Sequence, residues 1–204
     1  YTGDTLSNGD VFDGNGGSDT LYATFTTGAT RAPTSTEIET FDLTFKANAT
    51  LNFAKVDDVK TVNVNESSNR ISLINMDSTV AALNVFGTQA NAYHNIEYAP
   101  GVTDSNLKVT WTNNKANDEA GSLGVKRAGE FHFESKGQFD TYFSNLQPDL
   151  SNDAWQFDIS DATHPVTRVL EVVNSGKGDL ILGQKGAFPQ WAGGDGSDSY
   201  YYMG

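Results

Sequence analysis

The chain has 204 residues, enough for one sizeable domain, and it carries 26 acidic against 13 basic residues for a net charge of −13. This charge argues against a nucleic-acid partner, because phosphates repel an acidic surface. The lack of cysteine excludes disulfides and cysteine-based metal sites. No stretch approaches the ~18 consecutive apolar residues of a membrane span, and no secretory leader is predicted. A soluble piece of a longer protein is the expectation.

Residues 14–22 approximate the nonapeptide G-G-x-G-x-D-x-U-x, in which U is a large apolar residue. This pattern is typical of calcium-binding turns. Glycines let such a loop turn its carbonyls toward one point, and the Asp adds a charged oxygen for an ion that takes about six to eight hard oxygens. One nonapeptide supplies only part of that shell, so a stacked neighbouring turn must supply the rest. A plain glycine-rich turn is the alternative interpretation.

Residues 1–25 as a whole are predicted to form degenerate turns of this kind. Asp4, Asp10 and Asp19 are each followed two positions later by an apolar residue, and Asp10 and Asp19 are nine residues apart. If successive turns face opposite sides, Asp19 shares its ion with the turn near Asp4, and Asp10 faces away. Ordinary Asx turns are the alternative for Asp4 and Asp10.

A repeat follows a polar connector predicted over residues 26–37. The same apolar pattern recurs at a constant spacing of 21 residues, with alternating apolar and polar positions in each copy, in Ile38-x-x-Phe41-x-Leu43, Val59-x-x-Val62-x-Val64 and Val80-x-x-Leu83-x-Val85. A unit repeated in phase buries its apolar face by stacking. The prediction for residues 26–190 is an all-β parallel β-solenoid, a β-roll with calcium turns at both ends. An antiparallel sandwich with accidental periodicity is the alternative.

The repeat becomes irregular after residue 87. Phe139, Tyr142, Phe143 and Leu146 fall at helical spacing before Pro148, which predicts one short covering helix over about 138–147. Further strands then re-enter the ladder. Residues 191–204 begin new calcium turns, because 193–201 match the full nonapeptide. Across the chain, the predicted metal-site positions are Asp4, Asp10, Gly14, Gly16, Gly17, Asp19, Gly193, Asp195, Gly196 and Asp198.

Catalytic motifs are not apparent in this sequence. The three histidines, His94, His132 and His164, lie far apart, and single histidines on strands are usually structural. Paired carboxylates at Asp57-Asp58, or Asp158 with Asp161, are better explained as turn residues. The sequence therefore predicts no enzyme, no catalytic residue and no cofactor other than calcium.

The two nonapeptides resemble those of the repeats-in-toxin (RTX) family of secreted bacterial proteins, and the Thr/Asn-rich middle looks like the solenoid of Gram-negative surface-layer (S-layer) proteins. The resemblance implies type I secretion, calcium-triggered folding outside the cell, and a structural role in a self-assembling lattice at the cell surface. Its implied partners are further copies joined through calcium-bridged ends, with cell-surface polysaccharide as another candidate. The alternative is a module of an RTX adhesin that binds a glycan or a peptide.

Overall fold

The structure is a computed structural model, and it describes most of the chain up to residue 113 and the strands beyond it. The described residues are 3–65, 69–86, 92–102, 104–113, 121–127, 130–137, 140–144, 154–158, 168–174, 180–184, 191–192 and 199–202. All regular elements within them are β-strands, and every strand pairing is parallel. Among these residues no helix is long and apolar enough to cross a membrane.

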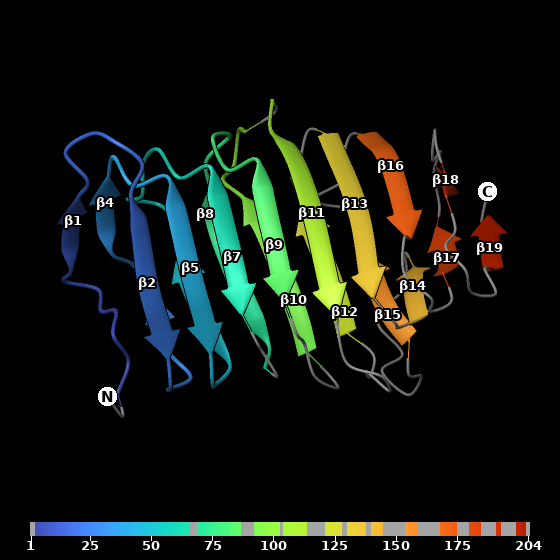
Figure 1. The fold of residues 1–204 in the computed structure, drawn as a ribbon, viewed down its shortest axis with the longest axis horizontal. Coiled ribbons are helices and arrows are strands. Elements are labelled where there is room, and N and C mark those ends of the chain that lie inside the picture. The colour runs from blue at the N-terminus through green and yellow to red at the C-terminus, as the bar shows by residue number, and fades with distance from the viewer. Residues whose placement is uncertain are drawn as a thin grey trace.

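The strands form two long sheets that run from one end of the molecule to the other (Figure 1). The eight-stranded sheet contains, from the N-terminal end, β2 (Thr20–Phe25), β5 (Thr40–Phe45), β7 (Thr61–Asn65), β9 (Ala82–Phe86), β11 (Asn106–Asn113), β13 (Glu130–Gly137), β16 (Arg168–Asn174) and β18 (Trp191–Ala192). The nine-stranded sheet contains, in the same direction, β3 (Thr30–Arg31), β6 (Ala49–Asn52), β8 (Ile71–Met76), β10 (Ala92–Tyr98), β12 (Gly121–Lys126), β15 (Ala154–Asp158), β14 (Asp140–Ser144), β17 (Leu180–Gln184) and β19 (Ser199–Tyr202).

The register of the eight-stranded sheet confirms the parallel solenoid and the 21-residue repeat. Phe41 pairs with Val62 and Val62 with Leu83, while the next inward row joins Leu43, Val64 and Val85. All six side chains are buried in one continuous core. Since parallel strands in register place identical positions side by side, a repeat of constant length keeps these apolar residues on the inner face.

Aromatic residues fill the first coils of this core. The rings of Phe25 and Phe45, on neighbouring strands, stack with centroids 4.4 Å apart. Phe41 meets Phe53, which follows β6 in the opposite sheet, with centroids 5.6 Å apart. The contact between Phe41 and Phe53 joins the two sheets across the interior.

Polar side chains form a second ladder on the outer surface of the eight-stranded sheet. The Asp42 carboxylate accepts hydrogen bonds from the Nδ2 of Asn63 (3.3 Å) and of Asn65 (2.6 Å), and Asn84 Nδ2 donates to Asn63 Oδ1 (3.0 Å). Stacked polar side chains are thus hydrogen-bonded to one another along the axis of the solenoid. Each bond joins residues on adjacent coils, so the ladder helps to fix the register.

Two details of the predicted organisation are wrong. Residues 26–37 are not simply a polar connector, because they contain β3 and β4 (Thr34–Thr36), and β4 pairs with β1 (Val11–Asp13) as a short third sheet. The helix predicted over 138–147 is replaced by β14, which pairs with β15 on one side and β17 on the other. Ladder pairing on both edges outweighs the local helical spacing, since helix propensity yields to tertiary context.

The order of β14 and β15 departs from a simple coil. Along the nine-stranded sheet β15 lies between β12 and β14, although β14 precedes it in the chain. Among the described strands, the solenoid therefore contains one exchange of rung order.

Candidate metal site

The segment before β2 lies along the N-terminal end of the solenoid and adds a first, irregular rung. Thr5 N–H donates to Thr24 O (3.1 Å), Thr34 N–H donates to Asp10 O (2.9 Å), and Gly14 N–H donates to Thr36 O (3.0 Å). Leu6 is buried beneath this segment. The predicted metal residues up to Asp19 are thus spread along an ordered rung.

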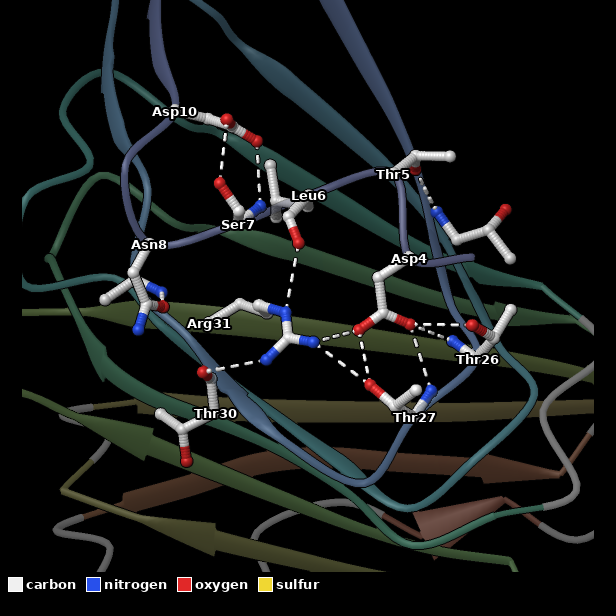
Figure 2. A network of polar contacts seen from close by, with 12 residues as sticks. Asp4, Thr5, Leu6, Ser7, Asn8, Asp10, Thr26, Thr27, Thr30 and Arg31 are labelled. Carbon is white, nitrogen blue, oxygen red and sulfur yellow. Dashed lines mark hydrogen bonds and ion pairs between the residues drawn. The ribbon is translucent and has the colours of Figure 1, made fainter. Parts of the chain in front are cut away.

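Asp4 is held by protein donors on both sides (Figure 2). Its Oδ1 accepts hydrogen bonds from Thr26 N–H (2.5 Å), Thr26 Oγ1 (2.9 Å) and Thr27 N–H (2.9 Å). Its Oδ2 accepts from Thr27 Oγ1 (2.6 Å) and forms an ion pair with Arg31. Burial opposes ionisation, but the hydrogen bonds from Thr27 and Thr26 outweigh it and hold the pKa of Asp4 well below its usual range. We call this cluster, Asp4 with Thr26, Thr27 and Arg31, the Asp4 latch.

Asp4 and Asp19 do not face one ion, so that part of the prediction is wrong. Asp19 immediately precedes β2, whereas Asp4 contacts Thr26 and Thr27 just beyond the other end of the same strand. A six-residue strand is about 20 Å long at ~3.3 Å per residue, too far for a shared ion. Asp10 accepts hydrogen bonds from Ser7 N–H (2.7 Å) and Ser7 Oγ (2.8 Å). These bonds lie within a local turn, which is the alternative interpretation given above for Asp10.

The loop from Gly14 to Asp19 has the left-handed backbone that the nonapeptide requires. Asn15, Gly16 and Gly17 have φ values of 55°, 78° and 127°. The opposite wall of the loop comes from Glu37, since an added Cβ on Gly14 would lie 1.8 Å from the Glu37 main-chain oxygen. The same added atom would lie 2.9 Å from Asp19 Oδ2. Only a glycine therefore fits at position 14, and two oxygens from different rungs converge there.

Asp19 has one oxygen that the described residues leave without a partner. Asp19 Oδ2 is buried and has no hydrogen-bond donor within the described part of the chain. The backbone around it is well held, because Asp19 N–H donates to Glu39 Oε2 (2.8 Å) and Thr40 N–H donates to Asp19 O (3.1 Å). The bond from Asp19 N–H lowers the pKa of Glu39. A buried, unpartnered carboxylate oxygen beside a main-chain carbonyl is suited to a hard cation.

Asp19 Oδ2 and the Glu37 main-chain oxygen are hard oxygen donors of the kind that calcium prefers. No three His, Asp or Glu side chains gather at metal-binding distance within the described residues. Main-chain carbonyl oxygens of the loop would have to supply the other ligands of a calcium ion. The second motif cannot be placed in the same way, because Gly193, Asp195, Gly196 and Asp198 lie outside the described residues.

His94 is the histidine whose side chain the structure describes, and it is buried in the core of the nine-stranded sheet. It pairs with Ile71 of β8 and Leu123 of β12. Burial lowers its pKa to about 3. A neutral histidine between two aliphatic neighbours is consistent with the structural role expected for it.

Comparison of this chain with protein-family models, with curated proteins and with solved structures found no match. The site is therefore interpreted from its own residues. Glu37 and Glu39 were missed in the sequence because they lie outside the nonapeptide. The pairing of β2 with β5 explains the position of Glu39. Thr20 pairs with Thr40, 20 residues later, so Asp19 lies beside Glu39.

Proposed function

We propose that this chain is a calcium-stabilised structural segment of an extracellular surface layer, secreted by a type I system and joined to further copies through its ends. The observation that carries the proposal is the buried Asp19 Oδ2, which has no donor within the described residues and lies, like the Glu37 main-chain oxygen, close to Gly14. The ligands would be Asp19 and the carbonyls of the loop over 14–19, and calcium would supply the positive charge that this oxygen lacks. No step of chemical catalysis is part of this role.

The scaffold supports a building block for three further reasons. The two long sheets end in β18 and β19 at one end, and at the other the nine-stranded sheet ends in β3 while the irregular rung covers part of β2, where Thr5 N–H donates to Thr24 O. Terminal strands offer backbone groups that pair with an added strand, and a contact between unlike ends generates open chains of subunits. The net charge of −13 repels neighbouring copies unless cations neutralise it.

The test is a calcium titration of the full chain followed by light scattering, size-exclusion chromatography and electron microscopy. We expect association above a calcium threshold and dispersal by a chelator, with magnesium as the control cation. A chain that stays monomeric while calorimetry shows its sites filled would contradict the lattice role. The adhesin interpretation would then be favoured, and glycan and peptide arrays would be the next measurement. Absence of calcium binding would contradict both.

A further inference from the structure

Two adjacent rungs each direct an oxygen into the space above Gly14. The Glu37 main-chain oxygen and Asp19 Oδ2 lie 1.8 Å and 2.9 Å from one point, the position of an added Gly14 Cβ. The two oxygens can therefore be no farther apart than the sum of those distances, which is a separation that one calcium ion can span with bonds of ~2.3–2.6 Å. Asp19 precedes β2, and Glu37 precedes β5, the next strand of the same sheet.

The conformation of Glu37 is unusual and serves this convergence. Its φ is 54°, in the left-handed region that residues with a Cβ rarely adopt. Its side chain also faces the loop, since Glu37 Oε2 lies 3.9 Å from where a Cβ on Gly16 would be. Both the carbonyl and the carboxylate of one residue thus approach the loop over 14–17. Strained backbone of this kind persists where a surrounding interaction requires it.

Glu39 fixes the other half of the arrangement. Its Oε2 accepts the hydrogen bond from Asp19 N–H at 2.8 Å, so it holds the Asp19 backbone while leaving Asp19 Oδ2 without a donor among the described residues. Glu39 is therefore a positioning residue. The carboxylates of Asp19 and Glu37 place two negative charges beside the same loop, an arrangement that a bound cation would stabilise.

We infer that Glu37, which lies outside the nonapeptide, completes a cross-rung site with Asp19 for a hard divalent cation, contributing its main-chain carbonyl and its carboxylate. The inference rests on the calcium role proposed above and adds the ligands of the second rung. The site favours calcium over magnesium, because it combines carboxylates and carbonyls from two segments rather than a compact octahedral cage. Cation binding would tie the glycine-rich loop to the corner at 36–39, and so would fix the first rung against the second.

Calorimetry of the full chain tests the inference, in an Asp198→Asn background that silences the second nonapeptide. We expect Glu37→Gln to weaken calcium binding at least tenfold, and Asp104→Asn, which removes one negative charge from an exposed position on a distant coil, to leave it unchanged. Glu37→Gly, which relieves the left-handed backbone and the repulsion from Asp19, should raise the unfolding temperature in chelator yet reduce the increase in unfolding temperature that calcium gives. A purely structural role of Glu37 would not produce this pair of changes.

The outcomes separate the two proposals. Calcium binding by the Asp198→Asn protein with an unchanged affinity in Glu37→Gln would overturn the role of Glu37 and leave the calcium role of the chain intact. Absence of calcium binding by the unaltered chain would overturn both. A Glu37→Gly variant that loses stability in chelator would show that Glu37 is a structural residue and would also contradict the inference.

Discussion

Replacing Asp4 by Asn should loosen the first rung without changing calcium binding. The change keeps the shape of the side chain but removes the negative charge of Asp4. That charge accepts hydrogen bonds from Thr26 and Thr27 and forms an ion pair with Arg31. Hydrogen bonds to a charged group contribute ~1.5–3 kcal/mol each and are not additive. Arg31 keeps its hydrogen bonds to the main-chain oxygens of Leu6 and Thr30, and its side chain is 19% exposed. Loss of the ion pair is therefore partly offset, and we expect a total loss of about 2–3 kcal/mol.

The loss should be local, because in a solenoid each rung contacts only its neighbours. Hydrogen exchange at the Thr26 and Thr27 amides is the most direct measurement, since both donate to Asp4. A loss of about 2–3 kcal/mol corresponds to exchange roughly 30- to 150-fold faster, at ~1.4 kcal/mol per factor of ten. Asp10→Asn is the matched control, because it removes an equal charge from an exposed turn of the same segment. Unchanged protection at Thr26 and Thr27 in Asp4→Asn would refute the latch.

Two further predictions concern the core. Leu83→Ala should cost about 3 kcal/mol in denaturant unfolding, because it empties a fully buried position between Val62 and Val109; a cost below about 1 kcal/mol would contradict this packing. The pKa of His94 is about 3 in the folded chain against 6.5 ordinarily, so its neutral form is compatible with folding and its charged form is not. Stability should therefore fall by about 1.4 kcal/mol per pH unit as pH drops below 6.5 toward the folded value, and His94→Leu should remove this part of the slope while the other two histidines remain.

The repeat made most of the fold predictable. The 21-residue spacing of Phe41, Val62 and Leu83 predicted the parallel rows that β5, β7 and β9 form, because burying an in-phase pattern requires stacking. The helix over 138–147 failed because the helical spacing of Tyr142 and Phe143 with their apolar neighbours is only a local pattern. Pairing of β14 with β15 and β17, which lie farther along the chain, decides in favour of a strand.

The candidate site was predictable only in part. The nonapeptide identified the loop and Asp19, and the structure gives that loop the left-handed backbone it needs. Asp4 has the same local pattern, yet its donors, Thr26, Thr27 and Arg31, are 22 to 27 residues away. Spacing along the chain shows which residues can bind an ion, whereas the partners that satisfy a carboxylate are set by which corners the coils bring together.

The most direct test of a calcium-stabilised solenoid is hydrogen exchange of the full chain in calcium and in magnesium, read out by mass spectrometry over residues 14–25 and 36–45. Binding at one hundred times the dissociation constant adds ~2.7 kcal/mol to the stability of the bound form. We therefore expect exchange through cooperative opening of these two segments to slow by about one hundredfold in calcium, with little change in the middle coils. Identical exchange of both segments in the two cations would contradict the central claim.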